Sequence, residues 1–131
     1  MLAAMQLNSD PATPVSLVAP LLAQVQALTS GASGHQERFK LLGLSRWLRL
    51  LSEQTDDLPF IGQEASNTVI ELVEHIDDQL EILRQHAEPG PLDWSHVRRH
   101  MLLTSRRHRL VSLAVALDDL LHMLNTGRGH A

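Results

Sequence analysis

Apolar residues recur along most of this chain at intervals of three and four positions, the spacing that places side chains on one side of an α-helix. The pattern is interrupted by short stretches rich in Gly, Pro, Ser and Asp at 29–34, 55–59 and 88–91. Such stretches are typical of turns. The pattern therefore predicts four helices. They span residues 14–28, 34–54, 59–87 and 93–126.

Helix ends are indicated by capping residues. Ser33, followed three positions later by Gln36, has the form of a capping box at the start of the second helix. Asp93 is an N-cap candidate for the fourth helix, and Gly127 is a suitable terminator. Pro20 lies inside the first apolar pattern, so we expect that helix to kink or restart there.

The periodicity of the apolar residues predicts an all-α fold. No stretch shows the apolar and polar alternation of a strand, and no internal repeat is visible. Short connections favour antiparallel packing of consecutive helices. We therefore predict one antiparallel four-helix bundle at residues 13–126, flanked by flexible termini at 1–12 and 127–131.

Charge predicts which helices are neighbours. Acidic residues are concentrated in the third helix between positions 64 and 81, whereas arginines are concentrated in the fourth between 98 and 109. These two helices are joined by a short turn, so we expect an antiparallel hairpin with opposite charges on facing edges. Exposed ion pairs add little stability, but they favour one helix order and orientation.

Composition excludes several classes of site. The chain has no cysteine, which rules out disulfides, thiolate metal sites and a cysteine nucleophile. Its net charge of -4 does not favour general nucleic-acid binding. No apolar stretch has the length of a membrane span, and the N-terminal residues lack the basic region of a signal peptide. We therefore predict a cytoplasmic protein without membrane association.

The fourth helix carries two different apolar faces. On an ideal helix each residue turns by about 100°. The apolar face of the first half then lies on the opposite side of the helix from the leucines of the second half. The first face consists of Trp94, Val97, Met101, Thr104, His108 and Val111. The second consists of Leu110, Leu113, Leu117, Leu120, Leu121 and Leu124. Either the helix kinks between them, or a continuous helix buries opposite faces in its two halves.

A straight helix in a monomeric bundle needs only one apolar stripe, so the excess predicts a second partner. We assign this interface to the leucines of the second face, Leu110 to Leu124, and expect a homodimer or a groove that binds a partner helix. The second helix supports this weakly, because Phe39, Leu42 and Leu50 lie opposite its main leucine row.

The sequence "HRLVS" at 108–112 places a histidine in a basic setting, as in histidine phosphotransfer domains. It resembles the His-x-x-Lys-Gly pattern of that family only in the histidine, because Val111 and Ser112 stand where the lysine and glycine belong. Phosphotransfer is therefore not predicted. We expect His108 to be a partly buried structural histidine instead.

Metal binding is the next alternative. His96 and His100 share a helix face, and His75 lies between acidic residues at one-turn spacing, so these three histidines are weak candidate ligands. A di-iron bundle would require Glu-x-x-His on two helices, and the fourth helix has none. The sequence predicts no metal and no other cofactor.

A basic patch on the fourth helix is the remaining candidate. Its members are Arg98, Arg99, Arg106 and Arg109. Nucleic-acid binding would favour aromatic residues interleaved with these arginines, and none are present. The acidic third helix instead offers the arginines ion-pair partners. We expect an intramolecular ion-pair face.

Taken together, the patterns predict a non-enzymatic protein-interaction module of the small regulator, adaptor or secretion-chaperone type. No catalytic motif is present: there is no nucleophile elbow and no phosphate-binding glycine loop. The alternative from another class is a ligand-binding or metal-binding bundle that uses histidines of the third and fourth helices.

Overall fold

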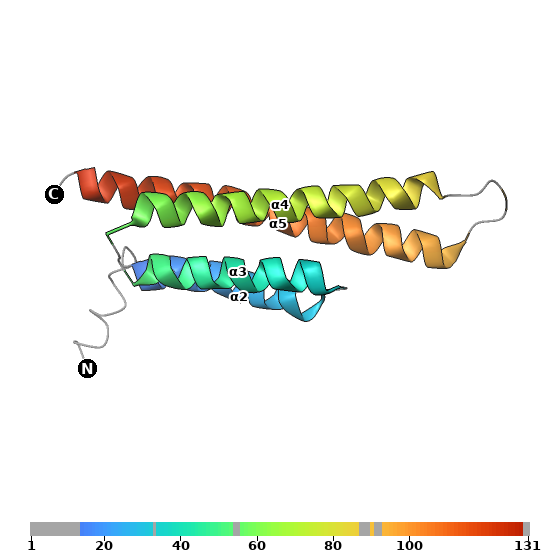
Figure 1. Cartoon of the computed structure of the whole chain (residues 1–131), viewed down its shortest axis with the longest axis horizontal. Helices are drawn as coiled ribbons and strands as arrows, with labels where there is room; N and C mark the ends of the chain where they lie inside the picture. The colour runs from blue at the N-terminus through green and yellow to red at the C-terminus, as the bar shows by residue number, and fades with distance from the viewer. Residues whose placement is uncertain (1–13, 33, 54–55, 87–89, 91–92, 130–131) are drawn as a thin grey trace, which may run out of the picture.

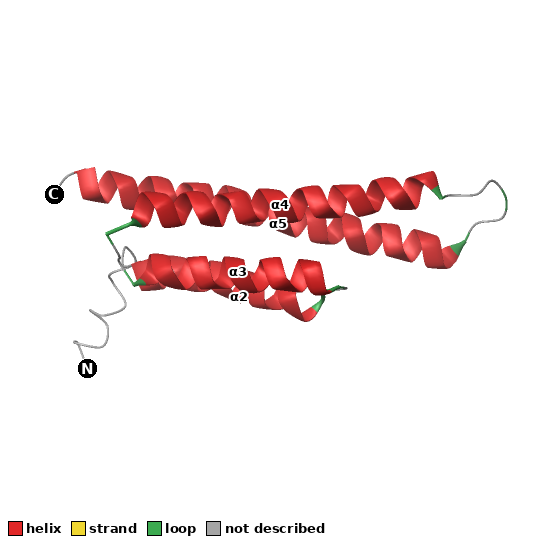
Figure 2. Ribbon diagram, in the orientation of Figure 1, coloured by secondary structure: helices red, strands yellow, loops and turns green. Residues whose placement is uncertain are grey.

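The computed structural model describes residues 14–32, 34–53, 56–86, 90 and 93–129. Within these residues the chain forms four helices and no strand (Figure 2). They are α2 (Pro14–Ser30), α3 (His35–Ser52), α4 (Leu58–Gln85) and α5 (Trp94–Gly129). The prediction of an all-α chain with four helices is confirmed.

Consecutive helices run in opposite directions and pack side by side (Figure 1). α2 contacts α3, α3 contacts α4, α4 contacts α5, and α5 contacts α2, which closes the ring. This is the predicted antiparallel bundle. The hairpin of α2 and α3 forms one layer, and the hairpin of α4 and α5 forms the other.

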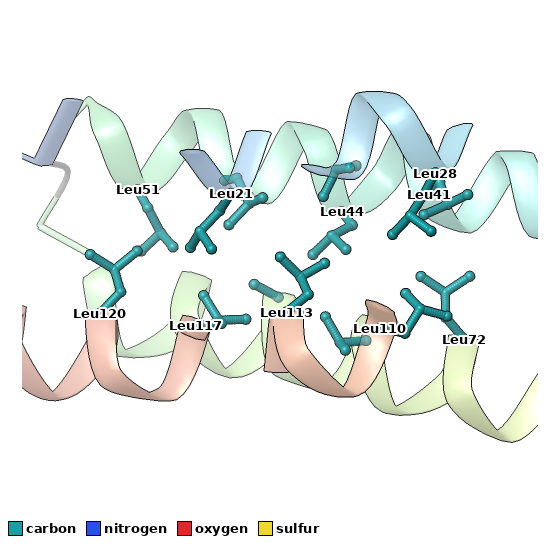
Figure 3. Packing of buried hydrophobic residues seen from close by; sticks show 14 of the residues in the cluster. Leu21, Leu28, Leu41, Leu44, Leu51, Leu72, Leu110, Leu113, Leu117 and Leu120 are labelled. Carbon is teal, nitrogen blue, oxygen red and sulfur yellow. The ribbon is translucent and has the colours of Figure 1, made fainter. Parts of the chain in front are cut away.

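The core lies between the two layers and is built mostly of leucine (Figure 3). All four helices contribute to it, because each carries a buried row at three- and four-residue spacing. α2 and α3 supply Val18, Leu21, Val25, Leu28, Leu41, Leu44, Leu48 and Leu51. α4 and α5 supply Leu58, Ile61, Ala65, Val69, Leu72, Ile76, Leu103, Leu110, Leu113, Leu117 and Leu120.

Some predicted helix ends differ from the structure. Asp93 caps α5 as predicted, since its Oδ1 accepts the backbone N–H of Ser95 at 3.0 Å. The N-cap of α3 is Gly34 without a side-chain hydrogen bond, and Ser33 lies outside the described residues. α2 continues through Pro20 without a break. α5 extends past Gly127 to Gly129, while the predicted flexible segment 1–12 lies outside the described residues.

The two layers differ in length. α4 and α5 have 28 and 36 residues, whereas α2 and α3 have 17 and 18. The longer hairpin therefore extends beyond the shorter one at the end where α4 stops and α5 begins (Figure 1). The last buried residue of α4 is Ile76 and the first of α5 is Leu103. We call the projecting part, residues 77–85 and 94–102, the open end.

No helix in the described part of the chain is both long and apolar enough to cross a membrane.

Candidate functional site

α5 is one continuous helix whose two apolar faces have different environments. The leucine face is not an interface: Leu110, Leu113 and Leu117 are each 1% exposed and belong to the core of the single chain (Figure 3). Leu120 is also buried, and Leu121 and Leu124 are partly buried against the same core. The assignment of these six leucines to an intermolecular surface is therefore wrong.

The correction has a simple structural reason. The hairpin of α2 and α3 lies beside the second half of α5 and covers its leucine face. α4 covers the adjoining side and approaches closely at Gly62, where an added Cβ would lie 2.6 Å from Leu121 Cδ2. Intramolecular packing thus accounts for all the leucines of this face.

The opposite face of α5 is the one left exposed. Trp94 is 69% exposed, Met101 65%, Val111 38% and Val115 59%, and Val97 is partly buried. We call this face of α5, from Trp94 to Val115, the outer stripe. Large apolar side chains at this exposure, aligned on one helix face, are typical of a surface that binds another protein.

The outer stripe also contains two polar residues at its middle, Thr104 and His108. Both are exposed. The expectation that His108 is a partly buried structural residue is therefore wrong. It failed because the face that carries His108 is turned away from the core.

The open end forms a second unpartnered surface. A groove of about 320 Å³ lies there between the two helices. Its lining residues are Gln79, Ile82, Leu83, His86 and Arg99. This groove continues the core face of α4 beyond the point where the other hairpin stops, so it remains open to solvent.

A third surface lies on the outer side of α3. Phe39 is 78% exposed and Leu42 is 55% exposed, as the sequence predicted for a face opposite the leucine row. Leu50, assigned to the same face, is partly buried against the core. Arg38, Leu42 and Arg49 line a groove of about 480 Å³ between α2 and α3.

Arg106 does not belong to a solvent-exposed basic patch. Its Nε donates to Oε1 of Glu37 on α3 at 2.8 Å, and its Nη2 donates to Glu37 Oε1 and to the carbonyl of Leu28 at the end of α2. The side chains are 13% and 2% exposed for Arg106 and Glu37, so the ion pair is largely buried. Arg106 therefore fixes the hairpin of α2 and α3 against α5.

The other members of the predicted patch, Arg98, Arg99 and Arg109, are exposed. They have no ion-pair partner among the described residues. The prediction that they pair with the acidic face of α4 is therefore wrong for these three arginines. Their charge remains available to a partner on the surface of α5.

Arg107 makes the predicted link between α4 and α5. Its Nε donates to Asp77 Oδ1 at 2.5 Å, and this hydrogen bond raises the pKa of Arg107 above its ordinary value. Lys40 of α3 also pairs with Glu71 of α4 at 2.8 Å. Opposite charge on facing edges is thus confirmed for one pair between α4 and α5, and α3 takes part as well.

The candidate metal ligands His75, His96 and His100 are not gathered into a site. Among the described residues, no group of three His, Cys, Asp or Glu side chains lies close enough to hold a metal ion. His75 instead shares a hydrogen bond of 3.0 Å with Gln79 on the same helix. The alternative of a metal-binding bundle therefore receives no support from these residues.

At the tip of α4 we expect Arg84→Gln to raise the pKa of Glu81 toward its ordinary value. The pKa of Glu81 is lowered mainly by its hydrogen bonds with Arg84, at 3.0 and 2.6 Å, and removing the guanidinium removes that stabilisation of the carboxylate. An NMR pH titration of the Glu81 carboxyl measures the change. Gln85→Ala, which removes only a weaker hydrogen bond of 3.3 Å, should shift the pKa less.

The described residues thus present three exposed apolar surfaces: the outer stripe, the groove at the open end and the outer side of α3. Each combines large apolar side chains with arginines that have no partner in the described part of the chain. The outer stripe is the longest, because it follows α5 from its first turn to Val115. No protein-family model, curated protein or solved structure was found to match this chain.

Proposed function

We propose that this protein is a non-enzymatic interaction module that binds a helix of a partner protein through the outer stripe of α5. Binding in this mode joins two apolar helix faces along their length, with anchor residues at three- and four-residue spacing. This mode of binding fits a small regulator, an adaptor or a secretion chaperone. We place the activity in the cytoplasm.

One observation carries the proposal. The apolar face that begins on the first half of α5 is exposed, although the other apolar face of the same helix is packed against the core. Trp94, Met101 and Val115 remain more than half exposed. Burying such side chains against a partner is favourable by about 25 cal/mol per Å² of apolar surface. The bundle itself does not need them, since its core is complete without them.

Site-specific photo-cross-linking tests this proposal. A benzoylphenylalanine residue placed at Met101 should form a cross-linked protein adduct in cells that naturally produce the protein, because a bound helix would lie against this side chain. The adduct is detected as a band of higher mass on a denaturing gel.

Gln24 provides the matched control, because it is exposed on α2 and lies outside all three apolar surfaces. The same photoreactive residue at position 24 should give no adduct. A lack of adduct at position 101, or equal yields at positions 101 and 24, would contradict the proposed docking surface.

The fold should tolerate changes in the outer stripe. The double variant Met101→Glu and Val115→Glu replaces two exposed side chains, so we expect the free energy of unfolding to stay within about 1 kcal/mol of the original protein. Urea unfolding followed by circular dichroism measures it. In the same variant, photo-cross-linking from Val111 should be lost.

A further inference from the structure

We propose that the helix bound by the outer stripe is α5 of a second copy of this chain, packed antiparallel around a two-fold axis. This inference rests on the proposed function and names the partner of the same surface. The arguments are the period of the stripe, the match between its layers, and the distribution of charge along α5.

The spacing of the stripe is that of a coiled coil. Its positions alternate in steps of three and four residues without interruption: Trp94, Val97, Met101, Thr104, His108, Val111 and Val115. This is the a and d pattern of a heptad repeat, which keeps one seam facing a partner helix along its whole length. A helix that only packed within its own bundle would need no such repeat on its solvent side.

Antiparallel pairing centred on residue 106 sets most layers of the stripe against a similar residue, except that Trp94 lies level with the partner's Asp118 at each end of the seam. In that register Met101 lies against the partner's Val111, and Val97 lies against the partner's Val115. The polar residues also meet, since His108 lies against the partner's Thr104, where a hydrogen bond can form in place of two buried unsatisfied groups.

Neighbouring antiparallel registers lack this match. A shift of one heptad in one direction sets Val97 against the partner's His108, and a shift in the other direction sets Met101 against the partner's Asp118. Each shift brings more layers of the seam into such a mismatch between a polar or charged group and an apolar one than the central register does, and each mismatch costs free energy when the polar group is removed from water. The central polar layer therefore specifies the register, as polar residues at core positions do in coiled coils.

Charge selects the antiparallel orientation. The first half of α5 carries the exposed cations Arg98 and Arg109, whereas the second half carries the exposed anions Asp118 and Asp119. A parallel pair would align the two basic halves. The antiparallel pair sets the basic first half of each copy beside the acidic second half of its partner. Arg98 and the partner's Asp119 then lie on the same flank of the seam, about 7.5 Å apart along the helix axis, which favours this orientation.

Engineered thiols test the orientation directly, because the chain contains no natural cysteine. Two variants are used, Val97→Cys and Val115→Cys, with a short bismaleimide cross-linker. In the antiparallel pair, a mixture of the two variants should cross-link, and peptide mass spectrometry should identify the link between positions 97 and 115.

Neither variant should cross-link efficiently to itself. In the antiparallel pair two copies of the same thiol are separated by about 27 Å, since the helix rises about 1.5 Å per residue. Cross-linking of each variant to itself would show a parallel pair and overturn the proposed orientation. Gln24→Cys mixed with Val115→Cys serves as the negative control, since position 24 lies on α2.

Charge reversal provides the second test. Arg98→Asp and Asp119→Arg should each weaken self-association, by on the order of tenfold in Kd when both symmetric pairs are affected. The double variant that carries both changes should recover much of the loss, because the pair is restored with reversed polarity. Sedimentation equilibrium at low salt measures all four Kd values.

The two proposals fail in different ways. If the purified protein is monomeric at all tested concentrations and the mixed thiols do not cross-link, the second copy is not the partner. The proposed function would then still hold if the photo-cross-link from position 101 joins a different protein. It fails as well if that position yields no adduct.

Discussion

Replacing Leu117 with glutamate is expected to unfold this protein. The side chain is 1% exposed and lies in the core between the two layers (Figure 3). Truncating a leucine at such a position costs about 2–5 kcal/mol, and a carboxylate adds the penalty of burying an unpaired charge. The total stability of a domain is about 5–15 kcal/mol, so a single change removes much of it. Loss of the helical circular dichroism signal at room temperature measures the outcome.

Val115→Glu is the matched control, since it lies two positions away on the same helix with the same change to a carboxylate. Val115 is 59% exposed, so the variant should retain the helical signal at room temperature. If Leu117→Glu instead gave a folded protein, the leucine face of α5 would have to be accessible to solvent, and the core described above would be incorrect.

The two faces of α5 show what the sequence pattern could predict and what it could not. The change of face was visible in the sequence, and the structure confirms that both faces lie on one continuous helix. Apolar character alone did not indicate which face is covered, because both faces are apolar. That choice depends on where α2 and α3 lie. They pack against the leucine side of α5, and the end of α2 and the start of α3 contact Arg106.

The outer stripe could have been assigned from one further signal. The stripe that contains Thr104 and His108 is the less apolar of the two, whereas the leucine face is uninterrupted from Leu110 to Leu124. Since a monomeric core favours the larger and more uniform apolar area, the leucine face is the better core candidate. The interrupted stripe is then the one left for a partner.

The position of Arg106 could not be inferred from its neighbours in sequence. It was grouped with Arg98 and Arg109 by local spacing, but its partner Glu37 is distant in sequence and belongs to another helix. One signal was available: Glu37 lies one turn before Leu41 on the buried row of α3. A carboxylate on an apolar row requires a cation from elsewhere in the fold.

The contact of Arg106 stabilises two helix ends at once. The carbonyl of Leu28 is in the last turn of α2, which has no basic residue of its own, and Glu37 is in the first turn of α3. Helix ends favour a cation at the C-terminus and an anion at the N-terminus. Gly31 leaves room for the guanidinium, because an added Cβ there would lie 2.8 Å from Arg106 Nη1.

Arg106→Ala is therefore expected to lower the free energy of unfolding by about 3–5 kcal/mol, the range for breaking a buried ion pair by removing one partner. The loss comes mainly from Glu37, which is 2% exposed and would lose this cation. Urea denaturation followed by circular dichroism gives the free energy. Arg109→Ala is the control on the same helix, and because Arg109 is exposed it should change the stability by less than about 0.5 kcal/mol.

The double variant Glu37→Leu and Arg106→Met separates the cost of leaving the buried Glu37 carboxylate without Arg106 from the value of the ion pair itself. Both residues then become apolar with similar volume, and such replacements are often neutral or stabilising. We expect this variant to recover most of the stability lost in Arg106→Ala. If it is as unstable as the single variant, the contribution of Arg106 lies in its hydrogen bond to Leu28 and in the packing of its side chain. The buried charge of Glu37 would then not be the reason that α5 needs an arginine at this position.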